Sequence, residues 1–487
     1  SINHALLLKW PERYGSIQRL IIDEAHELAG EGDRAFCEEI GSRELRSLLG
    51  QIAGGGSGGL ALALGNRAGD PALARRAVDL AARVERMLPA IGDALFGAAP
   101  NGSTVVPAGD VEVLPEPWRA PARLLGSLAA ELATLGEMLD HLNGMHRATL
   151  FADQGRAGDP LSASAGAVAL ALASAARGLI ADAFVQSRTA TVYAAQAFDR
   201  REAGHEWRLS ATPLEVADLI HARLLEPART VVAVSATLGI SGDPRPSLEK
   251  IGWQRVPAAR RLPPRVIPSP FDFPHQSVLA FVRGQQYRQP GFAARCATAI
   301  VEIARLLGGR TMALFTNRQR LGDVVARIAE HLAADGIAVL AQERPGGAAR
   351  LVEQFNADPR CVLLGLRSLW QGVDIPGEAL SCVVIEKLPF PRPDPLLVGR
   401  SRRIREAGGD DFRALSLEPA VVAFKQMFGR LIRNESDRGF VVVIGADTTM
   451  RYLPEFVASL PGPPRLVVGE LEEILTEMRA FFAPRAP

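Results

Sequence analysis

Two neighbouring carboxylates, Asp23 and Glu24, end an apolar run in the string LIIDEAHEL at Leu20–Leu28. The run predicts a buried β-strand, and open α/β sheets bind their ligands beyond the carboxyl ends of such strands. Paired acids at that edge suit Mg²⁺ and a polarised water, with the first carboxylate on the metal and the second on the water. The string therefore predicts a site for metal-assisted hydrolysis.

A second string, QMFGRLIR, occupies Gln426–Arg433. It sets Arg430 and Arg433 three residues apart on an expected helix, so that both guanidinium groups can face one phosphate group. Arginines in this role stabilise the charge that builds on a transferring γ-phosphoryl group. Either string alone is a weak signal, because Asp-Glu-Ala-His also fits strand ends that merely carry exposed acids.

Further strings strengthen the signal by their order along the chain. They are NHALL at 3–7, LSATPLEV at 209–216, VVAVSATL at 231–238, LFTN at 314–317, SLWQGVDIPG at 368–377 and KLPFPRPDP at 387–395. Together with the first two, this set resembles superfamily 2 helicases, and more narrowly their DinG and XPD branch. The resemblance covers both ends and most of the second half of the chain, whereas residues 29 to about 206 match by position only.

The resemblance implies ATP and Mg²⁺ as cofactors, bound in a cleft between two domains. Asp23 would hold Mg²⁺ and Glu24 the attacking water on one wall, with Arg430 and Arg433 on the other. Four more residues are implied to contact the nucleotide or its water: Gln426, Gly372, Asp374 and Gly429. Hydrolysis would then require the two domains to close on each other.

Three residues near these strings are implied to relay closure rather than to perform chemistry: His26, Ser235 and Thr237. A simpler reading stands beside each. His26 can merely satisfy a buried hydrogen bond, and Ser235 with Thr237 can form a turn or a helix cap.

Four residues are candidates for nucleic-acid contact: Asn317, Arg318, Trp370 and Arg392. Asn317 and Arg318 can bond to the phosphate backbone, and Arg392 lies in an expected surface loop. Trp370 offers a stacking face for a base, or else fills the core.

The resemblance implies a DNA helicase that moves 5′ to 3′ on single-stranded DNA and opens forked or R-loop duplexes in repair or replication, as a monomer. Two alternatives differ in class. An RNA helicase of the DEAH type shares the first tetrad, but its sixth motif usually reads QRxGRAGR, whereas Arg-Leu-Ile-Arg follows Gly429 here. A non-catalytic nucleic-acid-binding scaffold would not require Asp23, Glu24, Arg430 and Arg433 together.

One expected feature is missing from the sequence. The family needs a phosphate-cradling loop, GxxxxGK[ST], and none of the four lysines of this chain (Lys9, Lys250, Lys387 and Lys425) follows a glycine. We therefore expect an N-terminally truncated protein that is inactive alone. In the family a 4Fe-4S cluster, where present, lies between that loop and DEAH, so we expect any cluster upstream of Ser1.

Composition sets broad limits. The 487 residues are 47% hydrophobic and 22% charged, which suits a globular protein with an ample core. The formal net charge of +1 decides nothing about DNA, since tracking needs only a local basic groove. Residues 161–176 are uncharged but shorter than the roughly 20 apolar residues of a membrane span, so we expect a packed helix and a cytoplasmic protein with no membrane partner.

The fold class predicted is α/β, with two RecA-like, P-loop NTPase-type parallel-sheet domains and a mostly helical inserted arch. Residues 1–28 and 207–261 would form the incomplete first domain, 29–206 the arch and 262–487 the second domain. Helical spacing is clearest at 72–88 and 124–142. Six strands are predicted for the second domain, at 277–282, 311–315, 337–341, 362–365, 382–385 and 439–444.

Overall fold

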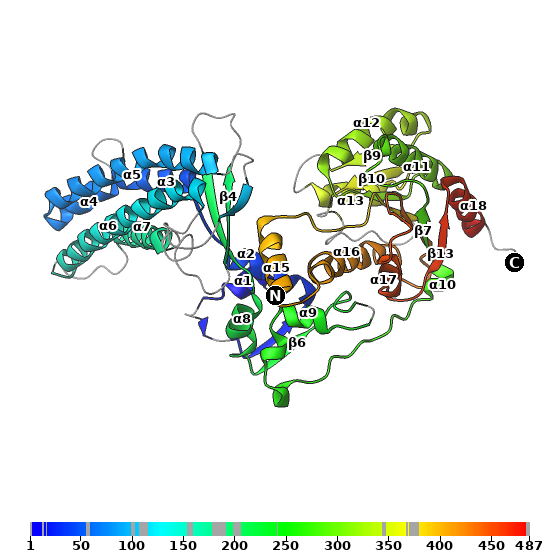
Figure 1. The fold of residues 1–487 in the computed structure, drawn as a ribbon, viewed down its shortest axis with the longest axis horizontal. Helices are drawn as coiled ribbons and strands as arrows, with labels where there is room; N and C mark the ends of the chain where they lie inside the picture. Colours follow the sequence, from blue (N-terminus) through cyan, green and yellow to red (C-terminus); the bar gives the residue numbers. More distant parts are fainter. Residues whose placement is uncertain are drawn as a thin grey trace.

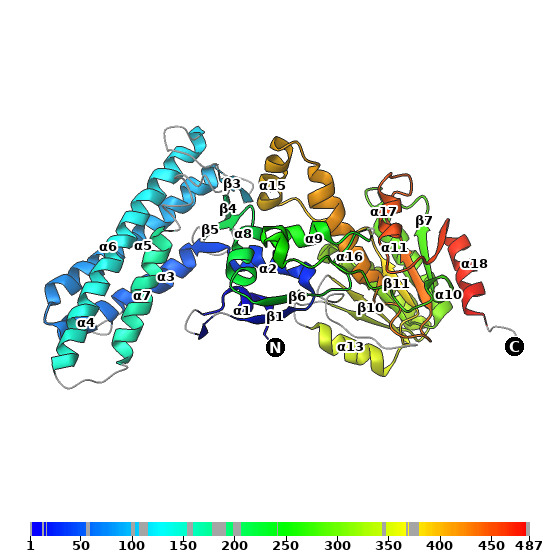
Figure 2. The ribbon, with the colours of Figure 1, turned by 90° about the horizontal axis from the view of Figure 1, so that it is seen from below.

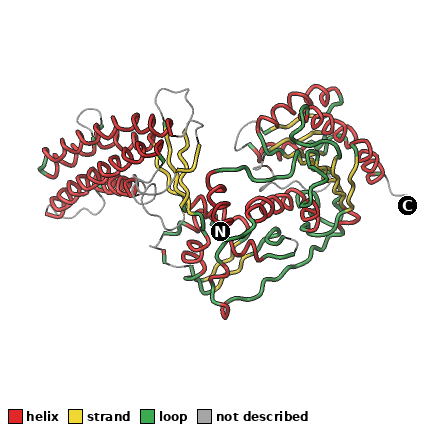
Figure 3. Tube along the Cα trace, viewed as in Figure 1, coloured by secondary structure: helices red, strands yellow, loops and turns green. Residues whose placement is uncertain are grey.

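A computed structural model describes residues 2–11, 14–15, 17–54, 59–98, 103–106, 115–152, 159–177, 191–197, 206–240, 242–342, 347–366, 369 and 379–483. A small α/β unit lies in the middle of the molecule, with a helical arm on one side and a larger α/β unit on the other (Figures 1 and 3). The chain leaves the middle unit for the arm, returns to it, and then enters the larger unit.

The middle unit is built on two described strands, β1 (Arg19–Ile22) and β6 (Thr230–Ala233), which pair in parallel (Figure 2). Its helices are α1 (His4–Leu8), α2 (Leu28–Ala35), α8 (Ala217–Ile220) and α9 (Arg245–Lys250). Leu20 and Ile22 are buried against these helices, but Ile21 between them is 75% exposed. The predicted buried strand is thus covered on one face only, because alternate side chains point to opposite faces and the described helices lie on one of them.

The arm consists of antiparallel helices. They are α3 (Ser42–Ala53), α4 (Leu60–Ala68), α5 (Pro71–Ala98), α6 (Glu116–Ala152) and α7 (Pro160–Arg177). Their apolar faces share one core, in which small and branched side chains such as Ala77, Leu88 and Leu135 are fully buried. The helical spacing read at 72–88 and 124–142 is confirmed by α5 and α6. No helix in the described part of the chain combines the length and apolar character that a bilayer crossing needs.

An antiparallel sheet joins the arm to the middle unit, and the sequence did not predict it. Its four described strands are β2 (Glu38–Gly41), β5 (Trp207–Pro213), β4 (Thr191–Ala197) and β3 (Ser103–Val106), in that spatial order. Residues from 207 onward were expected to return directly to the first parallel sheet, which is wrong for β5. Trp207 explains the placement, because its indole N–H donates to the Leu88 carbonyl at 3.0 Å and its ring fills the arm core.

The larger unit contains a fully parallel sheet of seven strands among the described residues. In spatial order they are β13 (Arg465–Gly469), β7 (Ser277–Val282), β12 (Gly439–Val443), β11 (Cys382–Ile385), β8 (Thr311–Leu314), β10 (Cys361–Gly365) and β9 (Ala338–Ala341). All six predicted strands are confirmed. The edge strand β13 was missed, since Arg465 and the exposed Leu466 give it no continuous buried run.

Helices cover both faces of this sheet. One face packs against α11 (Phe292–Leu307), α12 (Arg318–Ala334) and α18 (Leu471–Phe482), and the other against α13 (Ala348–Ala357), α16 (Glu418–Phe428) and α17 (Leu453–Ala458). The central strands are therefore buried along their whole length, as parallel sheets require. Helix α10 (Phe273–Gln276) adds Phe273 to the core on the second face, and α15 (Pro395–Glu406) lies outside the two layers.

Candidate active site

The two carboxylates stand on a sharp turn directly after β1. Glu24 has φ 47°, a left-handed conformation that is unfavourable for a residue with a Cβ. Two backbone bonds hold the turn against the segment after β6: the Val234 amide donates to the Ile22 carbonyl at 2.8 Å, and the Ala25 amide donates to the Val234 carbonyl at 3.0 Å. Non-glycine residues in this conformation cluster at active sites and ligand clamps, which makes Glu24 a candidate functional residue.

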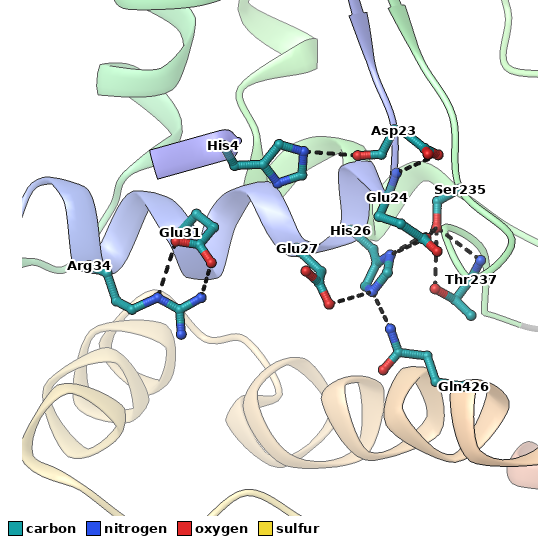
Figure 4. Close-up of polar contacts among 10 residues, drawn as sticks. All are labelled: His4, Asp23, Glu24, His26, Glu27, Glu31, Arg34, Ser235, Thr237 and Gln426. Atoms are coloured by element: carbon teal, nitrogen blue, oxygen red, sulfur yellow. Dashed lines mark hydrogen bonds and ion pairs between the residues drawn. The ribbon is translucent and has the colours of Figure 1, made fainter. Parts of the chain in front are cut away.

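Side chains of the two strings DEAH and SATL form one hydrogen-bonded network (Figure 4). The Ser235 hydroxyl donates to Glu24 Oε2 at 3.0 Å, and the Thr237 amide donates to Ser235 Oγ at 3.1 Å. His26 Nδ1 lies 2.8 Å from Ser235 Oγ and 3.4 Å from Glu24 Oε2. Two of the three expected relay residues, Ser235 and His26, are therefore in direct contact with Glu24, and Thr237 reaches it through Ser235.

The network extends into the larger unit through one residue. Gln426, on α16, forms a short contact from its amide nitrogen to His26 Nε2 (Figure 4). Each ring nitrogen of His26 thus has one partner, Nδ1 the Ser235 hydroxyl and Nε2 the Gln426 amide. The His26 side chain is 7% exposed, so both contacts are shielded from water.

These contacts keep Glu24 ionised. The His26 ring lowers the pKa of Glu24 most, and the Ser235 hydroxyl and the positive charge of Arg430 lower it further, against the opposing effect of partial burial. The Glu24 side chain remains 53% exposed. An ionised, accessible carboxylate is what a general base needs before a substrate water arrives.

The arginine string differs from its prediction in local structure. Helix α16 ends at Phe428, so Arg430 lies on the following turn and Arg433 beyond that turn, and they do not share a helical face. Leu431 and Ile432 lie between the two arginines in the chain, and both are buried in the core of the larger unit. Gly429 ends the helix, its amide donating to the Lys425 carbonyl at 2.8 Å.

The two arginines also differ in their surroundings. Burial lowers the pKa of Arg430, and the Glu24 carboxylate partly opposes that lowering. Burial also lowers the pKa of Arg433, partly opposed by Asp437, whose Oδ2 accepts from the Arg433 backbone amide at 2.8 Å. The charge of Arg430 thus acts on the carboxylate site.

The donor set fits Mg²⁺ only together with a phosphate ligand. No group of three or more metal-binding side chains is present within the described ranges. Asp23 and Glu24 are both exposed to solvent. One oxygen of the Asp23 carboxylate, Oδ1, accepts a hydrogen bond from the Glu24 amide at 2.9 Å. One or two carboxylates plus phosphate and water oxygens are the usual ligands of nucleotide-bound Mg²⁺. The site is consistent with that arrangement and not with a metal held by protein alone.

The chain is similar to known proteins in sequence and in fold. Residues 300–460 match the Helicase C-terminal domain family. The chain is 34% identical over 260 residues to the ATP-dependent DNA helicase YoaA of Escherichia coli K12, an alignment covering 53% of this chain and 39% of YoaA. It is 36% identical over 257 residues to the ATP-dependent helicase DinG of Mycobacterium tuberculosis H37Rv, covering 52% and 38%. A solved structure named "XPD_APO" aligns over 96% of this chain and 81% of its own, with TM-score 0.52 and 14% identity.

The chain is similar in sequence to DinG and YoaA and in fold to XPD. The XPD likeness concerns the fold, and the DinG and YoaA likeness is one of sequence over about half of this chain. A third relative, which covers 58% of this chain and 30% of its own length at 31% identity, is named 3′-5′ exonuclease DinG in Bacillus subtilis 168. The match spans under half the length of each of these relatives.

Candidate nucleic-acid residues of the DinG/XPD-like chain lie at the carboxyl edge of the parallel sheet. Asn317 is the N-cap of α12, where its side-chain oxygen accepts the Gln319 amide at 2.8 Å, and Arg318 is the first residue of that helix. Arg392 donates from its guanidinium to the Thr316 carbonyl at 2.7 Å. These three residues are thus close together, and Asn317 and Arg392 also have structural tasks there. Trp370, Gly372 and Asp374 lie outside the described residues.

Sequence reasoning missed several polar residues that organise the DinG/XPD-like fold near the site. Glu386 follows β11 and is fully buried, accepting from the Thr316 amide at 3.1 Å, and burial raises its pKa. Lys425 directly precedes Gln426 on α16 and reaches the middle unit. Lys425 had a usable signal, since it is one of only four lysines in an arginine-rich chain and adjoins a motif.

Proposed function

We propose that the chain is the motor portion of an ATP-dependent DNA helicase, which couples ATP hydrolysis between the middle and larger units to movement on single-stranded DNA. The observation that carries the proposal is the network that links Glu24, Ser235 and His26 of one unit to Gln426 of the other. A base whose hydrogen bonds extend across an interface will sense whether the two units are in contact. That dependence is what a motor needs to tie hydrolysis to domain motion.

In the proposed mechanism Glu24 accepts a proton from the attacking water, since its partners hold it ionised. Asp23 would hold Mg²⁺, and bound Mg-ATP supplies the phosphoryl group that the water attacks. Arg430 brings a positive charge toward the carboxylate site from the larger unit. Loss of contact between the units would separate Arg430 and Gln426 from Glu24 and stop turnover.

DNA would lie along the carboxyl edge of the larger sheet. Support comes from Asn317, Arg318 and Arg392, which are neighbours at that edge, and from the names of the DinG and YoaA relatives. We propose single-stranded DNA with forked or R-loop junctions as substrate, 5′ to 3′ movement, a monomeric protein, and a role in repair or replication. Duplexes with a 5′ or a 3′ single-stranded tail test the direction, because only one tail should support unwinding.

The deciding experiment is DNA-stimulated ATP hydrolysis with Mg²⁺, using Glu24→Gln as the matched variant. It compares this chain with a longer form that carries a GxxxxGK[ST] loop, because the 487 residues contain none. Turnover that single-stranded DNA stimulates in the longer form, and that Glu24→Gln abolishes, is the expected result. Turnover indifferent to Glu24→Gln would refute the assignment of the base, and DNA binding without turnover in the longer form would favour the non-catalytic scaffold.

A further inference from the structure

Helix α16 contacts the middle unit at three points along one side. Glu418, at its start, accepts from Lys250 Nζ of α9 at 3.1 Å. Seven residues later, close to two helical turns, Lys425 Nζ donates to the Gly239 carbonyl at 2.6 Å. Gln426 then contacts His26. Two of the four lysines in the chain therefore serve this interface.

The environment of Lys425 is unusual for a lysine. The residue is 9% exposed, and burial lowers its pKa. Removing an ammonium from water is costly unless it gains a strong partner, and an apolar side chain would fill the same space without that cost. The short bond to Gly239 is such a partner, but it belongs to the other unit. The ammonium therefore has this partner only while the two units touch.

The position of Gly239 connects this contact to chemistry. Gly239 lies four residues after Ser235 and two after Thr237, whose amide donates to Ser235 Oγ. Ser235 in turn donates to Glu24. The neighbouring residues Lys425 and Gln426 thus hold two ends of one network, the first through the SATL segment and the second through His26.

We infer that Lys425 is a positioning residue that fixes the segment Ser235–Gly239 against α16, so that Ser235 holds Glu24 in its reactive orientation only while the units are in contact. The role of Glu24 as a base rests on the proposed function above. The contact of Lys425 with Gly239 does not, and the two can be tested separately.

The first test measures the distance between the units in this chain and needs no ATP turnover. Spin labels at Ala222→Cys and Ala326→Cys, both exposed alanines on opposite units, report that distance in a Cys37→Ser background. The remaining cysteines are buried, and burial raises the pKa of Cys361 to about 12 and those of Cys296 and Cys382 likewise upward, so they will resist labelling.

Lys425→Met should lengthen the mean distance between the two labels and broaden its distribution, whereas Lys425→Arg should largely preserve the distribution. The control is Lys9→Met, the same change at an exposed lysine, which should give the distribution of the parent. Lys425→Met with the parental distribution would overturn the inference. A parental circular dichroism spectrum for Lys425→Met will show that the variant is folded; if it is not, Lys425→Gln takes its place.

The second test uses the longer form with a phosphate loop. Lys425→Met should lower kcat for DNA-stimulated hydrolysis about tenfold or more while changing KM for ATP less than twofold, because positioning acts after binding. Lys425→Arg should recover most of kcat. Equal kcat in Lys425→Met and the parent would overturn the positioning role. Absence of turnover in the parent would instead refute the proposed function and leave the distance measurement as the test of the contact.

Discussion

At the scale of single residues, Glu24 and its partners make a prediction about ionisation. Its folded pKa lies below the ordinary value of 4.5, chiefly because of His26. A lowered carboxyl pKa stabilises the folded chain above pH 4.5, and the contribution is lost as the pH falls through the lowered value. His26→Ala should therefore raise the pKa of Glu24 toward 4.5. Carbon NMR titration of the Glu24 carboxyl measures this directly, and His4→Ala, which removes only a bond to the Asp23 carbonyl, is the control.

Arg430 and Arg433 should not be equivalent, although the sequence treats them as a pair. Arg430 acts on Glu24, whereas Arg433 is tied to Asp437. We expect Arg430→Ala to lower turnover of the longer form by about 10³-fold or more, as loss of an arginine finger does. Arg433→Ala should cost less. A loss below about tenfold for Arg430→Ala would assign it a structural role instead.

At the scale of elements, strands marked by a local apolar pattern could be predicted from the sequence. Elements that depend on residues distant in the chain could not. Strands β7 and β11 were predicted to the residue because parallel strands buried on both faces are continuous apolar runs. The end of α16 was not, because Gly429 has an ordinary helical conformation and the turn beyond it depends on buried Leu431 and on Asp437. The antiparallel sheet was also missed, since β2 and β5 are far apart in the chain.

Two substitutions of Asn317, the N-cap of α12, can distinguish a structural role from a DNA-binding role. Asn317→Ala removes the N-cap and should lower the free energy of unfolding by about 1 kcal/mol. Asn317→Asp keeps the cap and adds a negative charge, so it should leave stability unchanged but weaken binding to single-stranded DNA. Fluorescence anisotropy with labelled oligonucleotide and chemical denaturation measure the two effects. Parental DNA affinity in Asn317→Asp would remove Asn317 from the DNA path.

At the scale of the whole molecule, the units hold most of the candidate hydrolysis site, but the chain has no GxxxxGK[ST] sequence to bind phosphates. We therefore expect this chain by itself to bind ATP weakly and to hydrolyse almost none, with or without single-stranded DNA. Glu24→Gln should then change nothing in this chain. Hydrolysis that Glu24→Gln removes would show that a phosphate site of another kind exists within these residues.

Helix α15 extends from the larger unit to the base of the arm and should couple the two. Arg400 forms a two-pronged ion pair with Asp33 of α2, in which Nη1 donates to Oδ2 at 2.9 Å, and its Nε donates to the Leu214 carbonyl at 2.8 Å. The Arg400 and Asp33 side chains are 22% and 21% exposed, so solvent screens them less than a surface pair.

A double-mutant cycle with Arg400→Ala and Asp33→Ala should give a coupling free energy of about 1–2 kcal/mol in the local opening of α15, measured by native-state hydrogen exchange. Arg402→Ala is the matched control, since Arg402 is 75% exposed and pairs only with Glu406 on the same helix among the described contacts. It should change opening by a few tenths of a kcal/mol. A coupling free energy as small as the effect of Arg402→Ala would mean that the ion pair does not hold α15 to the middle unit. Movement of the larger unit would then not reach the arm through this helix.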